Sequence, residues 1–147
     1  TGRPYANSGW CAKYIDIPSE PAYPFAFGLS YTTFEYSALK VLPGDGGKVH
    51  ARVRVEVKNT GRYEGEEVVQ LYVRDEAASI TRPVKELKGF EKIALKPGES
   101  KEVVFDITDE QLGFYDNRMN FVVEKGDFTF MVGTNSRDVD SVSYTLL

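Results

Sequence analysis

The chain has 147 residues, which suits one domain, or one domain with an arm, and is too short for two large layered domains. Its composition, 41% hydrophobic and 27% charged, is typical of a folded domain and carries no signature of disorder. The 18 basic and 22 acidic residues give a net charge of −4. Because the sequence has neither a basic stripe nor an apolar run of about 18 residues, nucleic acid and membrane are poor candidates as partners.

The single cysteine and the single histidine narrow the chemistry further. Cys11 alone forms no intrachain disulfide and no cysteine-based zinc site, and His50 alone leaves no multi-histidine metal site. We therefore expect no cofactor and no metal, and histidine-dependent catalysis would have to use His50 itself. The chain begins at Thr1 without the apolar region of a signal peptide, and we expect it to be part of a longer polypeptide.

Residues 1–31 form a distinct arm with neither helical nor strand periodicity. They hold four of the seven prolines and seven of the nineteen aromatic residues. Prolines favour an extended path, and large rings on an irregular segment need an apolar surface to lie against. The alternative is a disordered terminus. We expect an interdomain packing role for six rings of this arm: Trp10, Tyr14, Tyr23, Phe25, Phe27 and Tyr31. The last four are spaced so that an extended path would show one aromatic face.

From residue 32 onward the sequence predicts β-strands. Residues 33–42 form a first strand whose apolar phase slips near Ser37 and Ala38, which predicts a bulge. Residues 48–58 alternate strictly between apolar and polar side chains, as a half-buried strand does. The turn after it, Asn59-Thr60-Gly61, contains residues able to take positive φ. Residues 66–74 carry apolar side chains on both faces, which favours a central strand.

The second half continues in the same manner. Strands are predicted at residues 84–95 and 100–107, and shorter ones near residues 114–115, 121–123, 128–132 and 142–146. Thr108 and Gln111 have the spacing of a capping box, which predicts a single helical turn between strands. The glycine-rich run at residues 44–47 lies between strands with no helix after it, so it is not a phosphate loop.

Seven or eight short strands with regular turn signals predict an all-β fold. We expect an immunoglobulin-like β-sandwich of about seven strands over residues 32–147, with residues 1–31 as a linker or arm. Since the chain lacks the paired cysteines and the strand tryptophan of antibody domains, the disulfide-free fibronectin type III branch is the closer analogy.

Acidic residues offer the main candidates for chemistry. A glycosidase needs two carboxylates about 5–10 Å apart with different pKa values. The densest acidic cluster comprises Asp106, Asp109, Glu110 and Asp116. Its simpler interpretation is structural, because acids in a first helical turn complement the helix dipole. Asp138 and Asp140 are a weaker candidate for calcium. His50 points outward on its strand and is expected to be inert.

Several motifs in chain order resemble glycoside hydrolase family 3, the β-glucosidase and β-xylosidase group. The segment Tyr23-Pro-Phe-Ala-Phe-Gly-Leu-Ser-Tyr-Thr-Thr-Phe34 is similar to the family signature YPFGYGLSYTTF. Ala26 replaces the usual glycine, Phe27 the usual tyrosine, and Phe121 stands where tryptophan is common. The resemblance continues through further segments: residues 13–18, 57–61, 65–73, 82–90, 95–100 and 126–133.

The resemblance implies that this chain is the fibronectin type III-like domain that follows the catalytic domains of such an enzyme. In the family, the nucleophile and the acid/base residue lie in the preceding domains, so no position of this chain inherits a catalytic role. The implied parent is a retaining, exo-acting β-glycosidase, periplasmic or secreted, and its catalytic domains are the implied partner of the arm. An arm left without that partner is expected to dimerise or to fold back on the sandwich.

Two other functions remain open at this stage. The domain would bind polysaccharide directly if aromatic rings stood on outward strand positions, for which Tyr72 and Tyr144 are the candidates. It would be a free-standing enzyme or metal protein if the acidic cluster were its active site. The sequence does not indicate which sugar the parent would cleave.

Overall fold

The computed structural model describes residues 20–147, so Trp10, Cys11 and Tyr14 lie outside the described part of the chain. The predicted all-β architecture is confirmed. The strands are β1 (Phe34–Pro43), β2 (Ala51–Asn59), β3 (Gly65–Asp75), β4 (Glu86–Leu95), β5 (Ser100–Ile107), β6 (Phe114–Tyr115), β7 (Phe121–Val122), β8 (Gly126–Gly133) and β9 (Val139–Leu146), with one helix, α1 (Asp109–Leu112). A helix of four residues is too short to cross a membrane, and the described residues contain no longer one.

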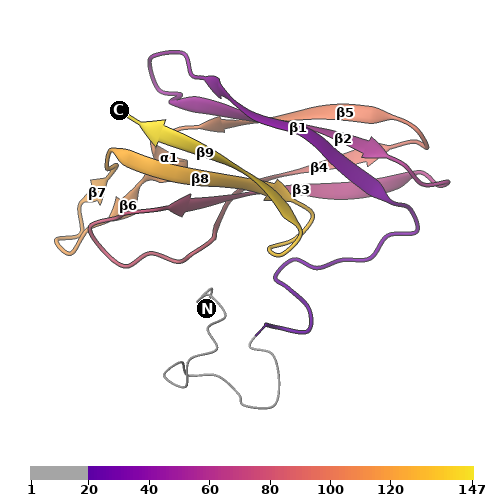
Figure 1. The fold of residues 1–147 in the computed structure, drawn as a ribbon, viewed down its shortest axis with the longest axis horizontal. Helices are drawn as coiled ribbons and strands as arrows, with labels where there is room; N and C mark the ends of the chain where they lie inside the picture. The colour runs from indigo at the N-terminus through magenta and orange to yellow at the C-terminus, as the bar shows by residue number, and fades with distance from the viewer. Residues whose placement is uncertain (1–19) are drawn as a thin grey trace.

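The strands form two antiparallel sheets that pack face to face, as Figure 1 shows. One sheet has the order β1-β2-β5, the other has the order β4-β3-β8-β9, and β6 and β7 form a separate small hairpin. The two main sheets bring their apolar faces together, with Val53 and Val55 on one side and Leu71 and Phe130 on the other. The arm leaves the start of β1 and runs below the four-stranded sheet in Figure 1.

Strand β3 lies between β4 and β8, which confirms its prediction as a central strand. Val69, Leu71 and Val73 belong to the core. Tyr72 on the opposite face is also buried, since only 2% of it is exposed. The continuous apolar pattern of this strand therefore reflects burial on both faces.

Both irregularities of strand pairing are bulges. The register of β1 and β2 shifts between Ser37 and Lys40, and Ala38 has φ 53°, which confirms the predicted bulge. A second shift, between β3 and β4 at Leu71 and Tyr72, had no signal in the sequence. A bulge moves one residue out of the ladder and bends the strand, so both sheets twist around the shared core.

Three details differ from the sequence-based expectation. Strand β2 begins at Ala51, because Val49 belongs to a loop whose backbone N–H donates to the Asp45 carboxylate. Strand β9 begins at Val139, earlier than expected. None of residues 59–61 has positive φ. Gly61 is required for space instead, since a Cβ there would lie 2.1 Å from Thr32 Oγ1.

Candidate functional site

The described part of the arm, residues 20–31, exposes its rings instead of burying them. Tyr23 is 73% exposed, Phe25 63% and Tyr31 97%, while Phe27 is less exposed at 41%. Pro24 is the one buried residue in this stretch. A cluster of large rings in water is unfavourable, and such patches mark interaction surfaces. The aromatic arm is therefore the leading candidate for a functional site.

The path of the arm is not extended throughout, as the prolines alone suggested. The Phe27 N–H donates to the carbonyl of Pro24 at 3.1 Å, which closes a turn, and Ala26 within it has φ 61°. This turn brings the rings of Tyr23 and Phe27 to a centroid distance of 5.2 Å. A residue with a Cβ is disfavoured at such a φ, which gives a physical reason for the glycine that the family signature has there.

The arm is attached to the turn between β8 and β9. The Ser136 N–H donates to the carbonyl of Phe25 at 3.1 Å, and the Arg137 guanidinium donates to the carbonyl of Pro21 at 2.6 Å. Both bonds use backbone carbonyls of the arm. The aromatic side chains are therefore not needed for this attachment and remain free to contact another surface.

Thr32, the residue that directly follows the arm, is held by Asn59, the last residue of β2. The Thr32 hydroxyl donates to Asn59 Oδ1 at 2.6 Å, and the Gly61 N–H donates to the same oxygen at 3.0 Å. Asn59 Nδ2 donates to the carbonyls of Tyr63 at 2.8 Å and Leu95 at 2.9 Å. Asn59 is fully buried, and its amide uses all of its donors in this network.

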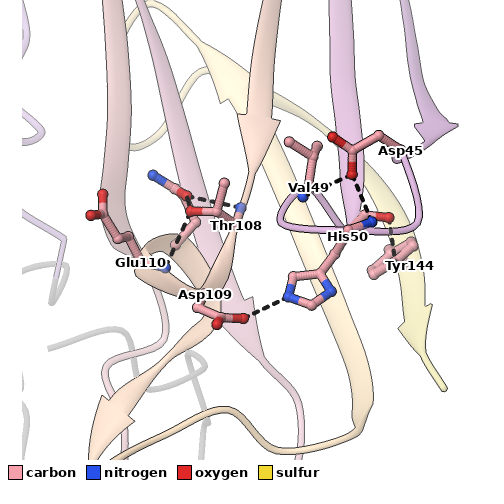
Figure 2. Close-up of polar contacts among 9 residues, drawn as sticks. Asp45, Val49, His50, Thr108, Asp109, Glu110 and Tyr144 are labelled. Atoms are coloured by element: carbon pink, nitrogen blue, oxygen red, sulfur yellow. Dashed lines mark hydrogen bonds and ion pairs between the residues drawn. The ribbon is translucent and has the colours of Figure 1, made fainter.

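The acidic cluster surrounds helix α1, and its carboxylates have local partners. Thr108 caps the helix by accepting from the Glu110 N–H, while the Gln111 side chain accepts from the Thr108 N–H at 3.0 Å. This confirms the predicted capping box. Figure 2 shows His50 pointing at Asp109, with 2.6 Å between Nε2 and Oδ1. The pair joins the segment before β2 to the helix, a contact that the expectation of an inert His50 missed.

Two other acids of the cluster, Asp106 and Asp116, contact partners other than Asp109. Asp106 pairs with Arg52 across strands at 2.9 Å. The backbone N–H of Asn120, followed by that of Arg118, holds the pKa of Asp116 below its ordinary value. A glycosidase general acid needs the opposite shift. These contacts give Asp106, Asp109 and Asp116 structural roles.

Asp138 and Asp140, the calcium candidates, are both exposed. Asp138 Oδ2 accepts from Asn135 Nδ2 at 2.8 Å within the β8–β9 turn. Across residues 20–147, no three acidic, histidine or cysteine side chains gather in a way that could hold a metal ion.

The two rings considered for direct sugar binding are not on the surface. Tyr72 is buried, and its hydroxyl donates to Gln70 Oε1 at 2.6 Å. Tyr144 is half-buried, stacks on Phe130 at 5.6 Å and donates its hydroxyl to the carbonyl of His50. Neither ring is available to bind sugar. Tyr72 alternates to the outer face of β3 but is covered there, and Tyr144 points toward the core, so the expected outward position is wrong for Tyr144.

Sequence reasoning missed a buried cationic residue, Arg82. Its guanidinium lies 3.0 Å from carboxylate oxygens of both Asp75 and Glu86, and it stacks over the Phe114 ring at 5.0 Å. It also donates to the carbonyl of Leu112 at 3.0 Å. Arg82 therefore ties β3, β4, α1 and the β6–β7 hairpin together. Its place in the motif at residues 82–90 was the only signal in the sequence.

Comparison with known proteins places this fold in context. A family model described as a fibronectin type III-like domain matches residues 67–136. The chain is 48% identical to a putative β-xylosidase of Formosa agariphila, over 90% of this chain and 18% of the relative. It is 46% identical to a periplasmic β-glucosidase of Salmonella typhimurium, over 100% of this chain and 20% of the relative.

Solved structures agree with these relatives. A β-glucosidase from Listeria innocua in complex with isofagomine superposes with a TM-score of 0.87 and 43% identity, over 99% of this chain and 21% of that one. A GH3 β-glucosidase from Bifidobacterium adolescentis gives a TM-score of 0.78 and 40% identity, over 84% of this chain and 18% of that one. The chain thus spans about a fifth of the length of the proteins it matches. The resemblance expected from the motifs is confirmed.

Proposed function

The chain carries a fibronectin type III-like domain of the kind found in glycoside hydrolase family 3 β-glucosidases and β-xylosidases, and from this premise we propose that it is a non-catalytic accessory domain. In this proposal it stabilises the catalytic domains of the same polypeptide by packing its aromatic arm against them. The exposed rings of the arm, held in place by backbone hydrogen bonds to the β8–β9 turn, carry the proposal.

Docking of the arm would remove the surface of these rings from water. A buried aromatic side chain removes roughly 150–250 Å² from water, and apolar area contributes about 25 cal/mol per Å². Burying Tyr23, Phe25, Phe27 and Tyr31 would contribute several kcal/mol, less the entropy of ordering the arm. Because the arm is already bonded to the sandwich at Ser136 and Arg137, part of the entropy of ordering it is lost before docking.

The same proposal covers the whole protein. We propose that it hydrolyses β-glycosidic bonds by a retaining mechanism with two carboxylates supplied by other domains. A periplasmic or secreted location is supported by the relative named as periplasmic. Residues 1–31 would be the linker, and residues 32–147 the sandwich. Dimerisation through a free arm stays a prediction for the isolated chain.

The test compares the full-length gene product with a version that ends before this chain. Both are assayed on aryl β-glucosides and β-xylosides, and their rates of thermal inactivation are measured. We expect the truncated version to inactivate faster and to lose activity. A truncated enzyme with unchanged heat resistance and activity would refute the stabilising role.

A second experiment tests whether the chain itself lacks catalytic activity. The purified chain of 147 residues is expected to release no sugar from either substrate. Release that disappears in an Asp109→Asn or Asp116→Asn variant would instead make the acidic cluster an active site.

A further inference from the structure

The two outer faces of the sandwich differ sharply in charge. On the outer face of the three-stranded sheet, cross-strand ion pairs join Arg52 to Asp106 and Arg54 to Glu102. Glu56 and Lys58 continue this pattern along β2. Val104 is an isolated exposed apolar residue among these charges, at 41% exposure. Such a surface is well solvated, and burying it would require the removal of water from several charges.

The outer face of the four-stranded sheet has no charge in its middle. The alternation along β3 and β8 places core residues such as Val69, Leu71 and Phe130 inward, and their neighbours outward. We call the resulting surface the uncharged face. Its exposed apolar members are Val68, Leu87 and Phe90. Three further residues of this face are buried, namely Gln70, Tyr72 and Met131, and the hydroxyl residues Ser141 and Ser143 of β9 continue it.

Ion pairs lie at both ends of the uncharged face, and Lys85, just before β4, donates to the carbonyl of Ser136 in the β8–β9 turn. Lys92 lies 2.6 Å from Glu66 at one end, and Arg74 lies 3.0 Å from Glu76 at the other. A centre depleted of charge, with charged residues at its rim, is the usual anatomy of a protein–protein interface.

Phe90 is the most exposed apolar residue of the uncharged face. Its side chain is 68% exposed within β4, whereas Val68 is 39% and Leu87 38% exposed. Gln70 faces Phe90 across the strands and is itself buried, with its amide donating to the carbonyl of Thr134 at 2.6 Å. The ring therefore stands exposed beside a buried, hydrogen-bonded neighbour, which suits an aromatic anchor in a partner's pocket.

We infer that the remainder of the glycosidase docks on the uncharged face, with Phe90 as its anchor, and that the charged face of β1, β2 and β5 stays in solvent. This inference rests on the proposed function. Two observations favour the remainder of the glycosidase as the partner that docks here. The chain spans only 18–21% of its relatives, so most of such a protein lies outside it. The arm is tied to the β8–β9 turn of this same sheet and runs on its side of the sandwich, as Figure 1 shows.

Matched substitutions on the two faces test the inference. Phe90→Thr removes the proposed anchor, and Val104→Thr makes the same kind of change on the charged face. Threonine is β-branched, like other residues that strands favour, so neither variant is expected to disturb its strand. In the isolated chain, both variants should unfold at nearly the parent midpoint, because both side chains are already exposed.

In the full-length enzyme the two variants should differ. Burial of a phenylalanine side chain is worth enough that losing it should speed thermal inactivation by about tenfold or more. Val104→Thr should leave the rate within about twofold. Equal inactivation rates for the two variants would overturn the inference.

Hydroxyl-radical footprinting supplies a readout that does not depend on stability. Phe90 should be oxidised in the isolated chain and protected in the full-length enzyme, while Val104 should react equally in both. Equal reactivity of Phe90 in the two proteins would also overturn the inference. If truncation destabilises the enzyme but Phe90 is unprotected, only the choice of face fails. If truncation has no effect, the proposed function itself fails.

Discussion

The hydroxyl of Thr32 donates a 2.6 Å hydrogen bond to Asn59 Oδ1 and so joins the first residue after the arm to the end of β2. The two residues are 27 positions apart in the sequence, and both are buried. The neighbouring Gly61 leaves the space that this contact needs, since a Cβ there would collide with the Thr32 hydroxyl. The direction in which the arm leaves the sandwich is therefore set by one buried amide.

Replacing Asn59 with alanine should destabilise the isolated chain strongly. The change leaves the buried carbonyl of Leu95 without its side-chain donor and removes the acceptor of Thr32. At about 1–3 kcal/mol for each unsatisfied buried group, we expect a loss of roughly 3 kcal/mol or more in the free energy of unfolding, measured by urea titration.

A pair of threonine variants provides the control for this network. Thr32→Val removes one hydroxyl from the network and should cost about 1 kcal/mol. Thr33→Val removes a hydroxyl whose contact with Thr60 is exposed, and it should cost less than about 0.5 kcal/mol. The role of the buried amide would be disproved by equal losses in the two threonine variants.

Tyr36 and Glu67 connect the two sheets across the core. The phenol donates to Glu67 Oε1 at 2.7 Å, and Glu67 is only 8% exposed. Burial, followed by the hydrogen bond and the charge of Glu67, raises the pKa of Tyr36, so the phenol remains a donor at any moderate pH. Tyr36→Phe should cost about 1–3 kcal/mol in the free energy of unfolding, because it leaves a buried carboxylate oxygen without this donor.

The matched control is Tyr63→Phe, since Tyr63 is largely exposed. Its loss is expected to stay within about 0.5 kcal/mol. Glu67→Gln keeps an oxygen that accepts from the phenol, so it should be milder than Tyr36→Phe. A Tyr36→Phe variant as stable as the parent would show that this contact contributes nothing.

Ala26→Gly should strengthen the turn of the arm. Ala26 has φ 61°, a conformation that costs an L-residue roughly 1–2 kcal/mol and that glycine adopts freely. The greater flexibility of glycine in the unfolded arm offsets part of this, which leaves a gain of up to about 1 kcal/mol. Hydrogen exchange of the Phe27 N–H, which donates to Pro24, should slow by about two- to fivefold.

The same substitution at Ala38, which has φ 53° in the bulge of β1, is the control. It relieves a similar strain far from the turn and should leave the exchange of the Phe27 N–H unchanged. Unchanged or faster exchange of the Phe27 N–H in Ala26→Gly would contradict the predicted relief of strain in the turn.

The stability of the chain should fall in acid partly through Glu86. Burial alone would raise the pKa of this carboxyl, but the hydrogen bonds and charges of Arg82 and Lys88 outweigh it and hold the pKa below its ordinary value of 4.5. A carboxyl with a depressed folded-state pKa contributes stability that is present above its unfolded pKa and lost as the pH falls through its folded pKa. The free energy of unfolding should therefore decline below about pH 5.

Urea titrations at several pH values measure this decline. Glu86→Gln should flatten it, while Lys88→Met, which removes one of the two cations, should flatten it less. If Glu86→Gln leaves the slope against pH unchanged, Glu86 makes no such contribution.

The elements of this fold follow from short-range patterns. The alternation in residues 48–58 predicted a half-buried strand, the apolar run in residues 66–74 predicted a central one, and Thr108 with Gln111 predicted the helical turn. Each depends on residues a few positions apart, where side-chain direction is dictated by backbone geometry. The slip at Ser37 and Ala38 revealed the bulge for the same reason.

The candidate site was only partly predictable. The rings of the arm stood out by composition, but its turn depends on the conformation of Ala26, which alanine does not signal. Tyr72 lies on the outer face of its sheet and Tyr144 on the inner face. Whether either ring is exposed depends on what covers that face, which the sequence does not indicate. The resemblance of the motifs indicated the family without indicating why Asn59, Gly61 or Arg82 is needed.

The sequence by itself thus determined the strands, the helical turn, the resemblance to β-glucosidases and β-xylosidases and the unusual aromatic load of the arm. Only the tertiary structure decided that Asn59 holds Thr32, that Tyr36 meets Glu67, that His50 meets Asp109, and that one outer face is charged and the other is not. The physical reason is that these contacts join residues 27 to 59 positions apart. Their partners are set by sheet order and register, which depend on how the whole core packs rather than on any local pattern.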